Sequence, residues 1–68
     1  MQHAAIQKSQ PARPISLDID GEPKGILIHD PRGYRFMAVK LDAFAVDGQV
    51  FATIEAAADA VRAAAREL

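Results

Sequence analysis

Apolar and polar residues alternate strictly in the segment ISLDID, residues 15–20. Its Ile and Leu side chains point to one side and its Ser and Asp side chains to the other, which is the pattern of a β-strand with one buried side and one wet side. The segment DGEPKG that follows concentrates glycine and proline and predicts a turn. The short apolar run ILIH then predicts a second strand over residues 24–29.

The tetrapeptide Asp30-Pro31-Arg32-Gly33 predicts a tight turn that closes a hairpin. Asp suits the first turn position, Pro fixes φ at the second, and Gly permits a left-handed conformation at the fourth. The partner strand is YRFMAVKL, residues 34–41. Both of its faces are apolar, with Tyr34, Phe36 and Ala38 on one and Met37, Val39 and Leu41 on the other. This strand is therefore expected to be central, or to meet a partner on its second face.

Asp47-Gly48 lies between the segments AFAV and QVFA and predicts a further tight turn. The segments on its two sides are short and apolar, which favours another hairpin with a brief fourth strand over residues 49–51.

The alanine-rich C-terminal segment predicts a helix that begins after Thr53 as its N-cap. Glu55 complements the positive end of the helix dipole, and Arg62 and Arg66 lie nearer its negative end. Apolar residues at helical spacing form one stripe: Ile54, Ala57, Ala58, Val61, Ala65 and Leu68. Because alanine is small, the helix axis can lie close to a sheet whose larger side chains fill the core.

These elements predict an α+β domain over residues 13–68: an antiparallel meander sheet of three to four strands, with one C-terminal helix packed on one face. Residues 1–12 combine Gln, Ser, Lys and Pro with a weak apolar pattern and predict a flexible N-terminal arm.

Composition limits the functional classes. A chain of 68 residues without Cys has no disulfide or thiolate metal site to support a small core, which makes self-association as a homodimer plausible. The net charge of -1 argues against a strong nucleic-acid binder. No segment has the length of a membrane span and the start lacks a signal-peptide pattern, so no membrane association and a cytoplasmic location are expected.

Candidate catalytic or metal-binding residues are few. His3 and His29 have no neighbouring ligands at metal-binding spacing, and no Ser or Thr has a triad partner. Asp18 and Asp20 share a strand face, but without a third ligand the pattern favours a solvated surface. The glycines form no phosphate-binding motif. The sequence therefore predicts no enzyme and no cofactor.

One stretch stands out as a candidate interaction surface, because basic and aromatic residues are interleaved there with apolar ones. Tyr34 and Phe36 allow either base stacking or packing in a core or dimer face, and Arg35 points away from them. The surface comprises Arg32, Tyr34, Arg35, Phe36, Met37, Val39 and Lys40.

From Ile26 onward the chain resembles the small antitoxin-type domains of the HicB family, over about two thirds of its length. In that family a hairpin with a Gly-Tyr pair leads to a Gly, a Thr and an Ala-rich helix that opens with Glu-Ala. The matching residues here are Gly33-Tyr34, Gly48, Thr53 and Glu55-Ala56. The spacing from Gly48 to Thr53 is longer here, the family's Pro-containing segment is missing, and nothing follows the helix.

The end of the chain, FATIEAAADAVRAAA, is also similar to AP2-like and integrase arm-type DNA-binding domains, in which a three-stranded sheet packs on a helix. Both resemblances imply a sheet with one C-terminal helix, and neither transfers functional residues. The leading hypothesis is a small bacterial protein-protein interaction module, a homodimer or an adaptor for a protein partner. The alternative is a nucleic-acid-binding domain that uses the sheet around residues 32–40.

Overall fold

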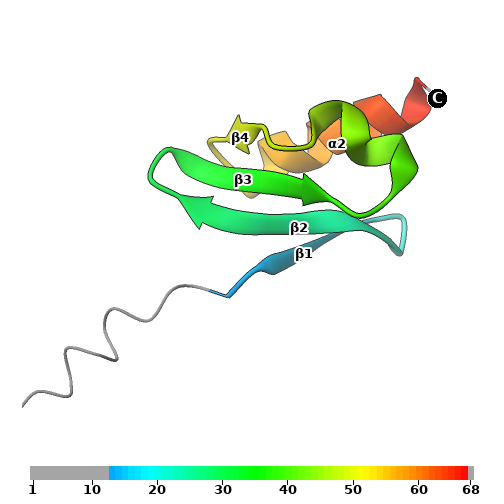
Figure 1. Ribbon diagram of the computed structural model, residues 1–68. Coiled ribbons are helices and arrows are strands. Elements are labelled where there is room, and N and C mark those ends of the chain that lie inside the picture. The colour runs from blue at the N-terminus through cyan, green and yellow to red at the C-terminus, as the bar shows by residue number, and fades with distance from the viewer. Residues whose placement is uncertain (1–12, 68) are drawn as a thin grey trace, which may run out of the picture.

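The computed structural model describes residues 13–67 of the chain. Its elements are the strands β1 (Ile15–Ile19), β2 (Glu22–Asp30), β3 (Gly33–Ala38) and β4 (Val50–Phe51), the 3₁₀-helix η1 (Leu41–Val46) between β3 and β4, and the helix α2 (Ile54–Arg66). The strands form one antiparallel sheet in the order β1-β2-β3-β4. Both α2 and η1 lie on the same side of it (Figure 1). The predicted α+β meander is confirmed, whereas the predicted arm over residues 1–12 falls outside the described residues.

The turn between β1 and β2 is shorter than the sequence predicts. Ile19 pairs with Glu22, so only Asp20 and Gly21 connect the strands. Asp20 has a φ of 54° and Gly21 a φ of 81°, the left-handed pair that a type I′ hairpin turn requires. β2 therefore begins at Glu22 instead of residue 24.

The predicted turn between β2 and β3 is confirmed. Asp30 pairs with Gly33, and the Arg32 backbone N–H donates to Asp30 Oδ1 at 2.9 Å. Gly33 has a φ of 141°, and a Cβ there would overlap the carbonyl oxygen of Phe51 on β4. Glycine is needed at this position for both reasons.

A β-bulge interrupts the β1–β2 ladder. Leu17 pairs with Gly25 while Asp18 pairs with Pro23, so Lys24 is the extra residue. A bulge places neighbouring residues on the same side of a strand. Lys24 consequently lies on the helix-covered side of the sheet and is buried, with 6% of its surface exposed.

The segment AFAV is not a strand, as the hairpin prediction implied, but part of η1. Backbone bonds of the 3₁₀ type hold it: Ala43 N–H donates to Lys40 O at 3.0 Å and Asp47 N–H to Phe44 O at 3.1 Å. The 3₁₀ turn buries Ala43 completely. It also ends β3 at Ala38, short of the predicted residue 41. The short fourth strand does form, although it pairs with β3.

The core lies between the sheet and the two helices. Leu27 and Phe36 from the central strands and Val61 from α2 are its largest fully buried side chains. α2 contributes mainly alanine to this layer, as the sequence predicts. Ala64 is buried where the predicted stripe had Ala65, and Leu68 lies outside the described residues.

The N-terminus of α2 matches the prediction. Thr53 has an extended backbone, and its Oγ1 accepts the Ala56 N–H at 3.0 Å. Glu55 occupies the first turn and Arg66 the last, where each opposes a partial charge of the helix dipole.

Candidate interaction surface

One side of the sheet carries no helix among the described residues, and we call it the open face. Side chains that are paired across antiparallel strands point to the same side, and neighbours along a strand alternate. Leu27 and Phe36 lie under the helices, so the residues that alternate with them along each strand, and their partners across the sheet, belong to the open face. These are Ser16 and Asp18 of β1, Pro23, Ile26, Ile28 and Asp30 of β2, Arg35 and Met37 of β3, and Val50 of β4.

An exposed line of large apolar side chains continues from the open face toward η1. Met37 lies on the open face near the end of β3, Val39 follows that strand, and Leu41 begins η1 directly after Lys40, whose backbone is extended. Leu41 and Phe44 are three residues apart in η1, a spacing that aligns side chains in a 3₁₀-helix. We call these four residues the apolar strip. Their exposed fractions are 44% for Met37, 60% for Val39, 77% for Leu41 and 51% for Phe44.

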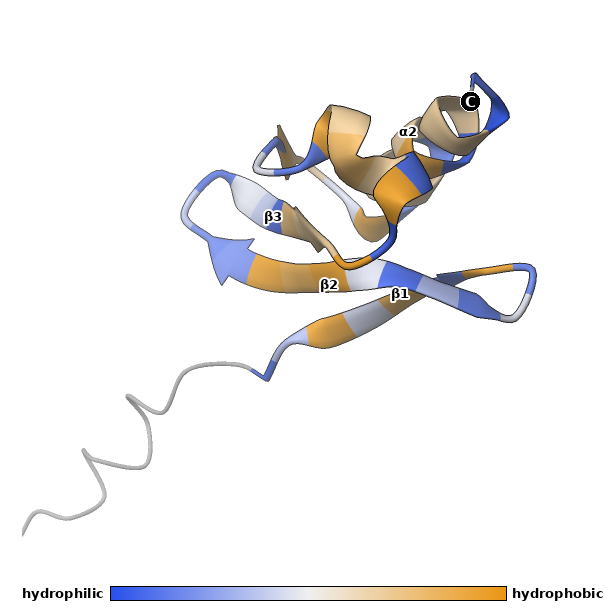
Figure 2. Cartoon of the chain, turned by 45° about the vertical axis from the view of Figure 1, so that its right-hand side comes forward, coloured by the Kyte–Doolittle hydropathy of each residue, from blue (hydrophilic) through white to orange (hydrophobic). Residues whose placement is uncertain are grey.

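The ribbon coloured by hydropathy shows which segments are apolar, buried and exposed ones alike. Orange, hydrophobic segments occupy the middle of β2 and the segment that links β3 to η1 (Figure 2). Monomeric proteins usually bury side chains of this size or scatter them singly, so a connected line of them marks an interaction surface.

The structure divides the predicted surface residues between two sides of the sheet. Phe36 is completely buried under α2, so it is a core residue and its assignment to a surface was wrong. Tyr34 is half-buried on the same side, where its ring lies 5.0 Å from that of His29. Both aromatic residues therefore pack in or against the core and do not form a base-stacking surface, because the strand register places them on the same side as Leu27.

Arg35 and Met37 are the predicted residues that the structure places on the open face, and the exposed Val39 follows just beyond the end of β3. Arg32 lies in the β2–β3 turn with 71% of its side chain exposed, and Lys40 lies beyond the end of β3. Ile26, Ile28, Leu41 and Phe44 were missing from the predicted surface. The β2–β3 register could have placed the two isoleucines, whereas Phe44 depended on recognising the 3₁₀-helix.

Asp30 forms ion pairs with the two arginine side chains of the β2–β3 hairpin. Arg32 Nε lies 3.2 Å from Asp30 Oδ1, and Arg35 Nη2 lies 3.4 Å from Asp30 Oδ2. The hydrogen bond from the Arg32 backbone N–H lowers the pKa of Asp30 most. The Arg32 side chain and the charge of Arg35 lower it further, against an opposing effect of burial. Arg32 and Arg35 are thus already paired with Asp30 within the chain.

The lowered pKa of Asp30 predicts a loss of stability in acid. The carboxylate stabilises the fold at a pH above its unfolded value of 3.8, and this contribution disappears as the pH falls through the lower folded value. We expect the urea midpoint to fall less between about pH 5 and about pH 3 in Asp30→Asn than in the original protein. Equal declines in the two proteins would contradict the role of Asp30.

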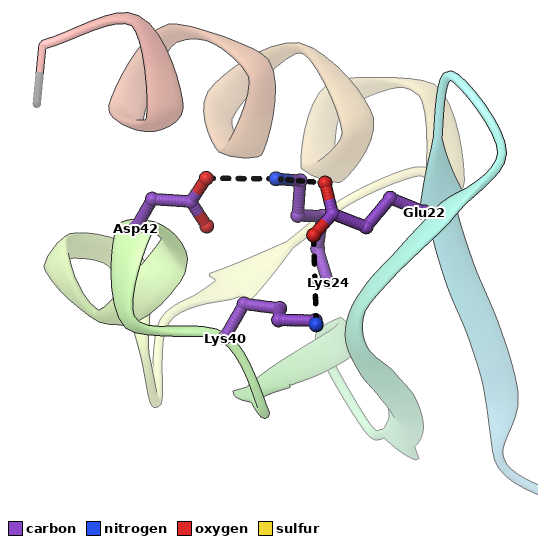
Figure 3. A network of polar contacts seen from close by, with 4 residues as sticks. All are labelled: Glu22, Lys24, Lys40 and Asp42. Carbon is purple, nitrogen blue, oxygen red and sulfur yellow. Dashed lines mark hydrogen bonds and ion pairs between the residues drawn. The ribbon is translucent and has the colours of Figure 1, made fainter.

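An ion-pair network centred on the buried Lys24 attaches η1 to the sheet (Figure 3). Lys24 Nζ lies 2.7 Å from Asp42 Oδ2 of η1 and 3.2 Å from Glu22 Oε1 of its own strand. Glu22 Oε2 in turn lies 3.5 Å from Lys40 Nζ. The hydrogen bond to Asp42 raises the pKa of Lys24 most, and the hydrogen bond from Lys24 lowers that of Glu22. The network fixes the start of η1, and with it the neighbouring Leu41.

A cavity of about 300 Å³ adjoins this network, between the β1–β2 turn and the C-terminal half of α2. Charged side chains of both signs line it: Asp20, Glu22, Lys24, Arg62 and Arg66. Opposite charges offset one another there, so the cavity favours no single class of charged ligand. Within residues 13–67, no cluster of three or more His, Asp or Glu side chains is placed to hold a metal ion.

None of the helices described in residues 13–67 is long and apolar enough to cross a lipid bilayer. Comparison of the chain with protein-family models, curated proteins and solved structures gives no match. The open face with its apolar strip is therefore the best-supported candidate site on physical grounds alone.

Proposed function

We propose that this domain is a non-enzymatic protein-protein interaction module that docks a protein partner on its open face. The observation that carries the proposal is the apolar strip, whose side chains are the large hydrophobic groups left exposed among residues 13–67. Burial of apolar surface is the main driving force of protein association. Ile26, which pairs with Met37 across the sheet, adds further apolar surface beside the strip.

The rigidity of this surface also supports the proposal. Met37 lies on the central strand β3, which is bonded to β2 and β4, and Leu41 begins η1, which Asp42 ties to the buried Lys24. A surface that is already ordered loses little conformational entropy on binding.

The nucleic-acid alternative has less support from the same contacts. Arg32 and Arg35 are both engaged by Asp30, and Lys40 lies beside Glu22. Tyr34 and Phe36 are on the other side of the sheet from Arg35, so no described surface combines stacking with phosphate contacts. Salt-dependent binding to single- or double-stranded DNA at low ionic strength would favour this alternative.

A charge placed in the apolar strip tests the proposal. We expect the original protein to self-associate in light scattering at high micromolar concentration or, as a monomer, to bind a fluorescent apolar dye. Met37→Glu should abolish whichever of the two is observed, because docking would bury the new carboxylate.

Ala63→Glu is the matched control, since it adds the same charge at an exposed position of α2. It should leave association and dye binding unchanged. A monomeric original protein that binds no dye would overturn the proposed function, as would equal effects of the two substitutions.

A further inference from the structure

The open face carries its charges in a self-complementary arrangement. Ile26 of β2 pairs with Ser16 on one side and Met37 on the other. Asp18 lies two residues beyond Ser16 on β1, toward one end of the strands, and Arg35 lies two residues before Met37 on β3, toward the opposite end. Strand spacings of ~4.8 Å and alternate-residue spacings of ~6.8 Å put each of them roughly 8 Å from Ile26. Asp18 and Arg35 thus lie on one diagonal, with Ile26 at its centre, and Asp30 lies next to Arg35 at the basic end.

The other diagonal runs toward Val39, which is apolar and exposed. Val39 follows the end of β3 at Ala38 and donates its N–H to Lys24 O at 2.9 Å, so it lies beside the bulge of β2. Leu41 extends this corner toward η1. A two-fold axis that lies in the interface, passes near Ile26 and runs perpendicular to the Asp18–Arg35 diagonal also passes close to Val39, so it brings each Val39 near its own copy.

The same axis exchanges the charged positions. It places Asp18 of each copy over Arg35 of the other, across the ~10 Å that separates two packed sheets. An aspartate and an arginine side chain together span that gap. Arg35 has several N–H donors, so it can keep its contact with Asp30 and donate to a second carboxylate. Asp18 accepts a hydrogen bond from Ser16 Oγ at 2.8 Å on one oxygen, which leaves the other oxygen for a partner.

We propose that the occupant of the open face is a second copy of this chain, packed face to face about this two-fold axis with two reciprocal Asp18–Arg35 ion pairs. The inference rests on the proposed function and adds to it the partner and the register of the interface. Apolar contacts at Ile26, Met37 and Val39 supply the affinity, and the two ion pairs select this orientation over others.

Charge reversal at the two positions tests the inference. Asp18→Lys alone and Arg35→Glu alone each place like charges opposite one another twice in the dimer. We expect each variant to raise the dimer dissociation constant by about tenfold or more in sedimentation velocity. An equimolar mixture of the two variants should form a heterodimer of the original affinity. In this heterodimer the unchanged Asp18 of one copy faces the unchanged Arg35 of the other, and the two substituted side chains form the second ion pair with the charges exchanged.

Arg32→Glu is the matched control, because Arg32 also contacts Asp30 but lies in the turn and not on the open face. It should dimerise like the original protein, and circular dichroism should show that all three variants are folded. If the dimer tolerates both charge reversals, the proposed register is wrong. The proposed function would still stand in that case if Met37→Glu dissociates the dimer. A monomer that binds apolar dye would overturn the second copy as partner and leave the proposed interaction role standing.

Discussion

Phe36→Ala is expected to destabilise the domain by about 3 to 5 kcal/mol, which is most or all of the stability of a domain this small. Phe36 is the largest fully buried side chain and joins the central strands to α2. Its truncation loses the free energy gained by burying the ring and leaves a cavity that the short helix cannot fill. Urea denaturation followed by circular dichroism measures the loss.

Met37→Ala is the control for this prediction. Met37 is the next residue of the same strand, but it lies on the open face with 44% of its surface exposed. When it is measured at a protein concentration at which the chain is monomeric, this truncation should lower the free energy of unfolding by less than about 1 kcal/mol. If the two substitutions had similar effects, the assignment of faces on β3 would be wrong, and the open face would lose its basis.

Gly25→Ala is expected to cost about 3 kcal/mol, at the upper end of overpacking effects. A Cβ at Gly25 would overlap the carbonyl oxygen of Met37 and the ring of Phe36, which lies over this glycine. The carbonyl belongs to the neighbouring strand, so no rotamer change relieves the collision. Thermal denaturation of the variant measures the cost.

Gly21→Ala supplies the comparison for that variant. Gly21 has a φ of 81° and open space where a Cβ would stand, so alanine there meets only the left-handed backbone penalty of about 1 to 2 kcal/mol. A Gly25→Ala protein that is as stable as Gly21→Ala would show that the Phe36 ring does not rest on β2 as described.

Local sequence patterns predicted the elements that depend on neighbouring residues alone. Alternation gave β1, the Asp30–Gly33 turn gave the β2–β3 hairpin, and Thr53 with the alanine stripe gave α2. Each of these rests on a period of two or of about 3.6 residues, or on the conformational preferences of one turn. The layer order followed because a single helix must cover an apolar side of the sheet.

Features that depend on contacts between distant segments were not predictable in this way. The bulge turns Lys24 to the helix-covered side of the sheet, where its ammonium group meets Asp42, which is 18 residues away. η1 replaces a predicted strand because Ala43 is buried against the rest of the core, a contact that no local pattern reveals.

The candidate surface was only partly predicted, because it too depends on contacts between distant segments. The sequence placed Met37 and Val39 opposite Tyr34 and Phe36 but did not decide which side the helix covers. That choice depends on Phe36 packing over Gly25 and under α2. Once it is made, the open face follows from the register, and its charge pattern follows with it.

The central claim is that two copies bury the open face against each other. An isotope-filtered NOE spectrum of an equimolar mixture of labelled and unlabelled protein tests it most directly, since it records only contacts between copies. We expect intermolecular signals from the methyl groups of Ile26, Met37 and Val39. Intermolecular signals from the exposed alanines of α2 instead, or none at a concentration where light scattering gives a dimer, would contradict the account.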